Sequence, residues 1–230
     1  MKLFQDFLSL FLQDKCPLCD RPGENIVCRD CDRQLQKTKL INPKRHWQGD
    51  LPLFVWGQYD GILKRAIATM KYNKSPQLGR WLGAQLGLQW RKSFPGPQTL
   101  TVIPIPMHPD KQKQRGFNQA EIIARQFAQV TGLRHEAQLL QRTKATQALF
   151  ELTVPQRQRE LQQAFSLNPK AFSQGFRQPI LLIDDIYTTG TTATEAQQTL
   201  RKAGLKVYGM AAIATPKTGK NPPPEGSRGI

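Results

Sequence analysis

The sequence predicts an α/β fold in which a mostly parallel sheet carries helices on both faces. Apolar runs of strand length alternate along the chain with segments of helical periodicity. The run at 179–185, PILLIDD, is continuously apolar up to its two acids, which is typical of a strand buried on both faces. A helix at 191–202 and a second apolar run at 206–215 complete a β-α-β unit.

The other elements are predicted from apolar spacing and from residues that begin or end helices. In chain order they are a strand at 52–59, helices at 60–72 and 76–92, a strand at 99–107 and a helix at 118–132. Asp60 and Asn118 are typical N-cap residues, and Gly132 ends the last helix. Prolines stop the strand at 99–107, so the polar, cationic segment 108–117 is predicted to be a loop.

Composition shifts divide the chain into three predicted units. Residues 1–45 hold a short amphipathic helix and a cysteine module, 46–216 form the α/β domain, and 217–230 form a flexible tail without apolar periodicity. Turn formers at 41–52 mark the linker. The first helix lacks a basic polar face, so we expect it to dock on its own domain and not on a membrane. Without an apolar run of roughly 18 residues, stable membrane insertion is not expected and a cytoplasmic location is predicted.

The chain is strongly basic. It has 33 Lys and Arg against 17 Asp and Glu, a formal charge of +16. Most of the excess lies in 41–177, where 20 basic residues face 7 acidic ones. Such a surface attracts nucleic acid or phosphorylated metabolites before any specific contact forms, although a merely solvated surface is the alternative explanation.

Four cysteines lie in one short segment, CPLCDRPGENIVCRDC, as Cys16-x2-Cys19 and Cys28-x2-Cys31. Each pair can form a knuckle that directs two thiolates at one tetrahedral metal ion. This spacing favours a structural zinc site, with an iron–sulfur cluster or a redox pair as the alternatives. Four protein ligands leave no open position, which argues against catalytic zinc.

Two adjacent acids, Asp184 and Asp185, end the strand predicted at 179–185. In open α/β sheets, ligands bind beyond the carboxyl ends of the strands, and the helix at 191–202 directs its first N–H groups at the same space. Hydroxyl donors and a permissive glycine lie between strand and helix: Thr188, Thr189, Gly190, Thr191 and Thr192. Phosphate on one side and carboxylates on the other suit a phosphorylated sugar, whose neighbouring hydroxyls can donate to both acids.

The segment LLIDDIYTTGTT closely resembles the phosphoribosyl pyrophosphate (PRPP) motif of type I phosphoribosyltransferases. The resemblance implies a type I phosphoribosyltransferase-like fold. It also implies that Asp184 and Asp185 bind the ribose hydroxyls, that residues 188–192 enclose the 5′-phosphate, and that Mg²⁺ accompanies the pyrophosphate.

Further segments occur in the order that resembles ComF family proteins, the competence-associated relatives of these transferases. They are the cysteine module, MKY at 70–72, VIPIPMHPDKQKQRGFNQA at 102–120 and the late PRPP motif, and the similarity covers 16 to about 215. Residues 142–165 resemble the flexible hood of the family, although Glu160 stands where Asn is expected. The resemblance implies a role in competence for DNA uptake, with single-stranded DNA or competence machinery as partners.

Basic residues before the acids are expected at the pyrophosphate. Lys71 and the loop that contains Arg115 and Gly116 would face it, because Arg offers a planar fork and Gly permits close backbone approach. We expect Asp184, Asp185 and Arg115 to carry the chemistry. Lys111 and Lys113 are expected to supply only long-range attraction.

The acceptor side is not predicted. Purine salvage enzymes of this class typically carry an aspartate base where this chain has Thr188, and no N-terminal nucleophilic cysteine with a glutaminase domain is found. The protein is therefore either a transferase with an unidentified acceptor, or a single-stranded-DNA-binding competence factor that retains the PRPP pocket without turnover. A P-loop hydrolase would need a G-x-x-x-x-G-K-[ST] motif, which the sequence lacks.

Overall fold

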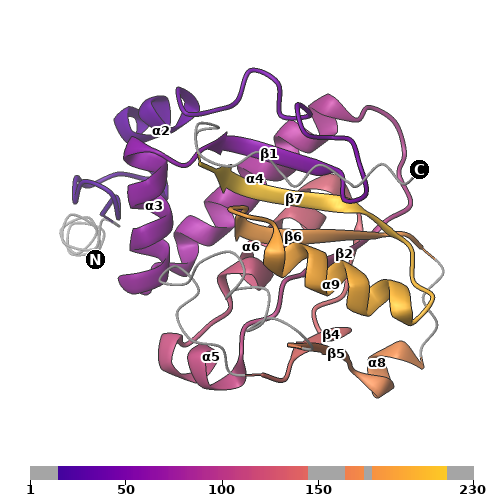
Figure 1. Cartoon of the computed structure of the whole chain (residues 1–230). Helices are drawn as coiled ribbons and strands as arrows, with labels where there is room; N and C mark the ends of the chain where they lie inside the picture. The colour runs from indigo at the N-terminus through magenta and orange to yellow at the C-terminus, as the bar shows by residue number, and fades with distance from the viewer. Residues whose placement is uncertain (1–14, 145–163, 174–177, 217–230) are drawn as a thin grey trace, which may run out of the picture.

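A five-stranded, wholly parallel sheet forms the centre of the chain (Figure 1). The computed structural model describes residues 15–144, 164–173 and 178–216. The strand order is β1-β7-β6-β2-β3, with β1 Leu53–Gln58, β2 Thr101–Pro104, β3 Arg134–His135, β6 Ile180–Ile186 and β7 Val207–Thr215. A separate antiparallel pair joins β4 (Leu140–Arg142) to β5 (Phe165–Leu167). The carboxyl edge of the sheet, where β6 ends, faces α3 (Figure 1).

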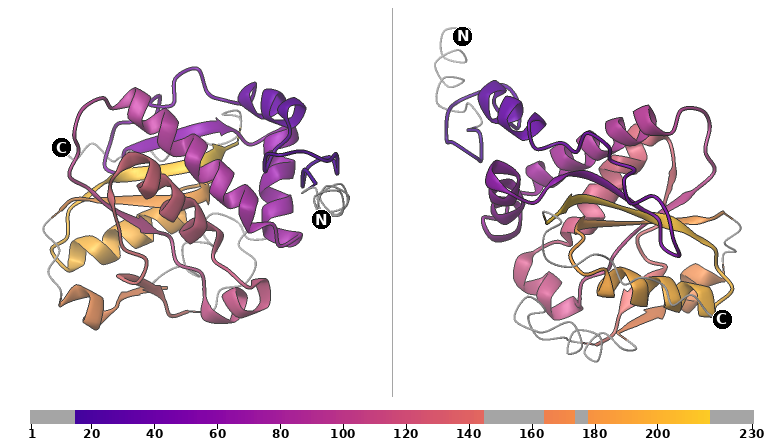
Figure 2. Two further views of the ribbon diagram at one scale, coloured as in Figure 1. Left: turned by 180° about the vertical axis from the view of Figure 1, so that it is seen from behind. Right: turned by 45° about the horizontal axis from the view of Figure 1, so that its top comes forward.

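Helices cover both faces of the sheet, as the two views of Figure 2 show. One face carries α3 (Gly61–Tyr72), α4 (Pro76–Ser93) and α6 (Gln119–Thr131). The other carries α9 (Thr191–Lys202), the β4–β5 pair and the short α8 (Pro169–Phe172). The cysteine module with α2 (Arg29–Gln36) lies against α3. The predicted fold class, a mostly parallel sheet with helices on both faces and a small N-terminal cysteine module, is confirmed.

The sheet has an apolar core on each face, and the strands contribute to both because their side chains point alternately to one face and the other. Phe54 and Trp56 of β1 are fully buried under α3 and α4, whereas Leu53 and Val55 face the core beneath α9. Strand β6 contributes in the same way to both sides. Because successive side chains of a strand point to opposite faces, a continuous apolar run is what a sheet covered twice requires.

Glycines allow α4 and α6 to approach closely. Gly79, Gly83 and Gly87 recur every fourth residue on α4, on the side that faces α6. A Cβ added at Gly83 would lie 2.5 Å from the carbonyl oxygen of Ile123. The helix backbones therefore meet directly, and this contact fixes the position of α6 relative to the sheet.

The predicted helices at 60–72, 76–92, 118–132 and 191–202 are confirmed to within one or two residues at each end. The Asp60 side chain accepts a hydrogen bond from Gly61 N at 2.8 Å, and Asn118 caps α6 through Ala120 N at 3.1 Å. Gly132 ends α6 in the left-handed conformation. The four predicted strands are also found, although the one at 99–107 is confined to β2, which ends at its first proline.

The loop predicted at 108–117 is wrong, because Pro109–Arg115 form helix α5. His108 caps this helix through Asp110 N at 3.3 Å, Pro109 begins it, and Gly116 ends it with a φ of 91°. Proline at the first helical position and glycine just beyond the last are ordinary helix limits, but the polar segment between them has no apolar face. It was this missing face that favoured a loop.

The outer edge of β1 is covered by residues 39–46, which include the first part of the linker predicted at 41–52. His46 pairs with Leu53 and Lys39 with Gly57 as isolated antiparallel bridges.

The boundary near residue 45 stays a prediction. The predicted first helix, most of the hood at 142–165 and the tail at 217–230 lie outside the described residues. None of the helices in the described ranges combines the length and apolar character that a bilayer crossing requires.

Candidate functional site

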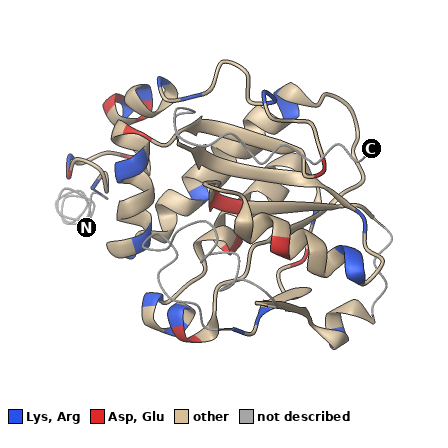
Figure 3. Ribbon diagram, viewed as in Figure 1, with Lys and Arg blue, Asp and Glu red and all other residues tan. Residues whose placement is uncertain are grey.

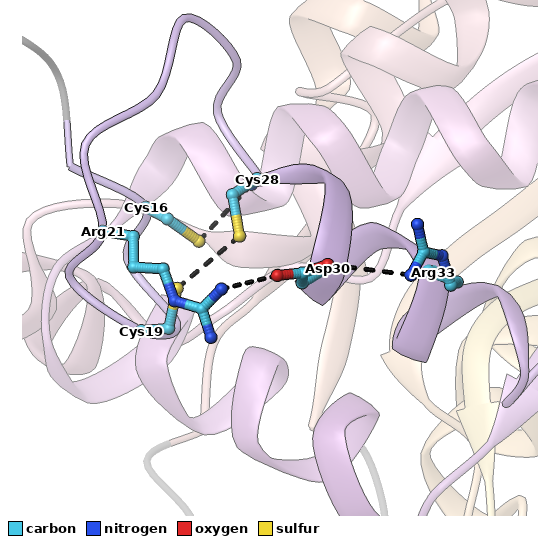
Figure 4. A network of polar contacts seen from close by, with 6 residues as sticks. All are labelled: Cys16, Cys19, Arg21, Cys28, Asp30 and Arg33. Carbon is cyan, nitrogen blue, oxygen red and sulfur yellow. Dashed lines mark hydrogen bonds and ion pairs between the residues drawn. The ribbon is translucent and has the colours of Figure 1, made fainter.

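The four cysteines converge as their spacing predicts. Figure 4 shows three of them, Cys16, Cys19 and Cys28. The sulfur atoms of Cys16, Cys19, Cys28 and Cys31 all lie within 4.8 Å of one another, and Cys19 Sγ is 3.6 Å from Cys28 Sγ. In a tetrahedral zinc–thiolate site with bonds of about 2.3 Å, neighbouring sulfur atoms are about 3.8 Å apart. The donor set and its geometry therefore fit a structural zinc ion.

Local backbone geometry sets the two knuckles. The Cys16 carbonyl accepts hydrogen bonds from the amides of Cys19 (3.2 Å) and Asp20 (2.8 Å), which turns the chain back on itself. Cys28 precedes α2, and its pKa falls to about 7, chiefly because a backbone hydrogen bond at Cys31 stabilises the thiolate. Burial raises the pKa of Cys31. Across the module, Arg21 pairs with Asp30 at 2.5 Å (Figure 4).

The cysteine module shares its core with the rest of the protein. Cys16, Val27 and Leu35 are buried in the same apolar cluster as Leu63 of α3. Gln36 at the end of α2 donates to Gln85 of α4 at 3.1 Å. A metal at the cysteines would therefore stabilise the packing of α2 on α3, beyond the loop that binds it.

Strand β6 ends in the two predicted acids, and they lie in different environments. By the alternation of the strand, Asp185 continues the face of Leu181 and Ile183, and Asp184 continues the face of Leu182. Asp185 makes an ion pair with Lys71, the next-to-last residue of α3. Their side chains are only 6% and 17% exposed, so this is a buried pair. Lys71 is thus the partner that compensates the neighbouring acids.

The acids also differ in their pKa. Burial alone would raise the pKa of Asp185, but the Lys71 ammonium outweighs it and holds the pKa below its usual range. Burial alone would lower the pKa of Lys71, but the negative charge of Asp185 outweighs burial, and the pKa of Lys71 is raised. The pKa of Asp184 is raised well above its usual range by burial and by the Asp185 charge beside it. Asp184 Oδ1 accepts the Asp185 amide at 2.8 Å.

Asp184→Asn is expected to stabilise the ligand-free protein at pH 7, because it removes a carboxyl group whose charged form is disfavoured by burial and by the Asp185 charge. Because the folded pKa is raised, Asp184 of the native state keeps its proton at pH values above about 3.9, where the unfolded state has lost it. The free energy of unfolding therefore falls as the pH rises from about 3.9 to the raised pKa. The variant has no carboxyl group at position 184 to titrate, so this fall in stability disappears. Its amide oxygen can still accept the hydrogen bond from the Asp185 amide. Urea unfolding of wild type and variant between pH 4 and 8 measures this effect. If the free energy of unfolding depends on pH as in the wild type and is lower at pH 7, the prediction is wrong.

The loop after β6 turns through Gly190 into α9. Gly190 has a φ of 77°, and a Cβ there would lie 2.2 Å from the Tyr187 hydroxyl. Thr189 and Thr191 share a hydrogen bond between hydroxyls at 2.9 Å, and α9 begins at Thr191. All five predicted phosphate-loop residues, 188–192, therefore lie where strand, loop and helix start meet at the edge of the sheet, and the first turn of α9 presents its N–H groups there.

Gly190→Ala should destabilise the protein more than Gly204→Ala, by about 1–3 kcal/mol. Both glycines have a φ of 77°, which costs a non-glycine residue about 1–2 kcal/mol, but nothing lies within 4 Å of a Cβ at Gly204. The matched pair isolates the clash with Tyr187 from the cost of the backbone conformation. Chemical unfolding measures both variants, and equal losses would show that Tyr187 does not restrict the loop.

Helix α5 brings Arg115 to the same edge. Arg115 donates to Gln119 Oε1 at 2.8 Å, and its guanidinium lies 5.8 Å from the centre of the Tyr72 ring. It is close enough to Lys71 for each positive charge to act on the other. Gly116 follows as the left-handed end of α5. Lys71 contacts Asp185 and Arg115 acts on Lys71, whereas the predicted role of all three residues at a pyrophosphate stays a prediction. Figure 3 shows acidic colour where β6 ends and basic colour on the neighbouring α3 and α5.

Arg142 of β4 is a candidate that the sequence did not indicate. Its guanidinium lies 5.7 Å from the centre of the Phe165 ring, and the negative charge of Asp184 acts on it. Burial lowers the pKa of Lys111, and the charges of Arg142 and Arg115 lower it further. We call Lys71, Lys111, Arg115 and Arg142 the cationic cluster. A two- or three-residue strand such as β4 carries no periodicity from which Arg142 could have been predicted.

Fold and site together define a parallel α/β protein with an acid pair and a glycine-threonine loop at the carboxyl edge of its sheet, joined to a four-cysteine module. No family model matches the sequence. The chain is 32% identical to Competence protein F of Haemophilus influenzae, over 85% of this chain and 89% of that protein. It is 27% identical to DNA utilization protein YhgH of Salmonella typhi (82% and 78%) and 25% identical to Competence protein ComFC of Bacillus subtilis (82% and 72%). The chain belongs to the ComF family of Competence protein F.

Solved structures give a weaker likeness. An adenine phosphoribosyltransferase from Leishmania tarentolae matches 77% of this chain and 94% of its own, with 13% identity and a TM-score of 0.39. A score this low does not bear on the function of the chain, which has to be inferred from its own residues and its family.

Proposed function

We propose that this protein binds PRPP at the carboxyl edge of its sheet. One observation carries the proposal: an acid pair, of which Asp185 is buried, and a threonine-rich helix start lie at one edge of the sheet near the cationic cluster. The two acids carry at most two negative charges, against four positive charges in the cationic cluster. The raised pKa of Asp184 favours its neutral form and so reduces the negative charge further. A ligand with several negative charges and neighbouring hydroxyls matches this balance.

Each part of the ligand has a matching group. Asp184 and Asp185 accept hydrogen bonds from the ribose hydroxyls, and residues 188–192 with the start of α9 hold the 5′-phosphate. Lys71, Arg115 and Gly116 lie toward the pyrophosphate, where Arg115 offers two parallel donors. In the ligand-free structure Lys71 is bound to Asp185, so binding requires it to share its charge between that carboxylate and the incoming anion.

Magnesium fits this site as a companion of the ligand. Among the described residues, the four cysteines are the single group of three or more side chains that could hold a metal ion by themselves. Mg²⁺ prefers six oxygen ligands and is usually bound by one or two carboxylates together with substrate phosphates. The acid pair can supply the carboxylates, and the pyrophosphate of PRPP supplies the remaining oxygens that the protein lacks.

The chemistry that we propose is pentosyl transfer. The bond between the ribose carbon and pyrophosphate breaks, the acceptor forms its bond to that carbon, and the departing anion is stabilised by the cationic cluster with Arg115 foremost. The acceptor, and the group that takes its proton, are left open. The alternative is a protein that binds PRPP without turnover.

The names of the relatives support a role in competence. Two of them are named competence proteins and one a DNA utilization protein. We propose that this chain acts in DNA uptake from the cytoplasmic side, with single-stranded DNA or competence machinery as its partner. The +16 formal charge is compatible with a DNA partner.

Calorimetric titration of the zinc-loaded protein tests both parts. PRPP should bind in the presence of Mg²⁺ and bind more weakly without it. A single-stranded oligonucleotide should bind with an affinity that falls steeply between low and moderate salt, because basic residues displace counterions. Absence of PRPP binding with Mg²⁺ would overturn the PRPP proposal, and salt-independent or absent oligonucleotide binding would overturn the DNA partner. Release of pyrophosphate with a panel of bases and amines separates transfer from binding alone.

A further inference from the structure

Tyr72 is the most exposed aromatic side chain near the acid pair. It is 71% exposed, although it is a large ring at the end of a helix whose other face is buried. It directly follows Lys71, whose ammonium group contacts Asp185. An aromatic ring is thus held in solvent one residue away from a buried ion pair of the candidate site.

Arg115 supports this ring from another element. Its guanidinium carbon is 5.8 Å from the ring centre, within cation–π range, and a hydrogen bond of 2.8 Å to Gln119 fixes it from behind. Gln119 is itself buried at the start of α6. The ring therefore has a held cation on one side, and its high exposure leaves surface for a second stacking partner.

We infer that Tyr72, backed by Arg115, is a stacking platform for the planar ring of a nucleobase beside the sugar site. The inference rests on the proposed function for its orientation. With the 5′-phosphate at residues 188–192, the opposite end of the sugar points toward Lys71 and Arg115. The pyrophosphate lies on the side of Lys71 and Arg115, so a base approaches the same ribose carbon from the other side, toward the part of the Tyr72 ring that Arg115 does not cover.

The platform is suited to bases in general. Stacking of a base on an aromatic side chain contributes about 1–3 kcal/mol and discriminates little between bases, because every base has a π face. This corresponds to roughly 5- to 150-fold in affinity. The ring can come from a mononucleotide or from a base in a single strand, since both present the same planar surface.

Paired ligands with and without a ring test the platform on the zinc-loaded full chain. Ribose 5-phosphate and uridine 5′-monophosphate form one pair, and a short oligothymidylate and an abasic strand of equal length form the other. We expect the ring to raise affinity at least about 5-fold in one pair. Tyr72→Ala should abolish this gain and leave the ringless ligand unchanged, and Tyr72→Phe should keep the gain. Phe172→Ala, which removes another partly exposed ring on α8, is the matched control.

The outcomes separate the two proposals. A gain with the mononucleotide that depends on Tyr72 assigns the platform to free nucleotides, and a gain confined to the strand pair assigns it to single-stranded nucleic acid. No gain in either pair, or a gain that survives in Tyr72→Ala, overturns the platform. Failure of both PRPP and ribose 5-phosphate to bind overturns the sugar site instead, and the strand pair then decides the platform by itself.

Discussion

Replacing Asp184 and Asp185 together with Asn is expected to weaken Mg²⁺-dependent PRPP binding by at least about 100-fold. In the proposed complex each carboxylate accepts a charge-assisted hydrogen bond from a ribose hydroxyl, and such bonds contribute about 1.5–3 kcal/mol each. An asparagine keeps one acceptor oxygen but loses the charge, and it cannot help to hold Mg²⁺. Calorimetric titration of wild type and variant with PRPP measures the loss.

Folding has to be measured alongside binding in this experiment. Without the Asp185 carboxylate, the Lys71 ammonium is left buried and unpaired, which costs about 3–5 kcal/mol when one partner of a buried pair is removed. Asp184→Asn alone avoids this cost and should still bind PRPP more weakly. Asp50→Asn, which breaks an exposed pair with Arg201, is the control for the loss of an acid. Wild-type affinity in folded Asp184→Asn and in the double variant would contradict the assignment of the acids.

Removal of the metal from the cysteine module is expected to lower the melting temperature by roughly 10–20 °C. Two or more buried side chains, Val27 and Leu35 among them, would lose their packing, at about 1.5–3 kcal/mol each. Each kcal/mol corresponds to about 2–4 °C in a chain of this size. Metal analysis and thermal unfolding before and after treatment with a strong chelator measure the effect, and Cys31→Ser should reproduce it.

Arg33→Ala is the matched control within the module. Its side chain is 72% exposed and lies 3.8 Å from Asp30, so the expected change is within about 0.5 kcal/mol. A protein that contains no metal as purified, or one whose melting temperature is the same with and without the chelator, would show that the four thiols are held by the fold alone.

Most of the architecture was predictable because it depends on local signals. The helix that begins after Asp60 and the one that ends at Gly132 have both a periodic apolar face and a capping residue. Strands β3, β4 and β5 were not predicted, since two or three residues carry no period and form only when a neighbouring strand is already in place. Helix α5 lacks an apolar face, so its sequence favours a loop.

The candidate site divides in a similar way. Asp184, Asp185 and the loop after them are contiguous, so one stretch of sequence contains both the acids and the start of α9. The residues that complete the environment come from distant segments: Lys71 pairs with Asp185 across the sheet edge, and Arg142 reaches Asp184 from β4. The family resemblance placed Lys71 at the site, but its pairing with Asp185 and the approach of Arg142 depend on how helices and strands pack, which sequence order does not show.

Helix α3 links the two chemical centres of the molecule. One end of its buried face packs against the cysteine module through Leu63, and the other end carries Lys71 and Tyr72. Twelve helical residues form a stiff rod of about 18 Å, which does not bend easily between these points. Loss of order at the cysteines would therefore be expected to reach Lys71 and Tyr72 as a displacement of one rod.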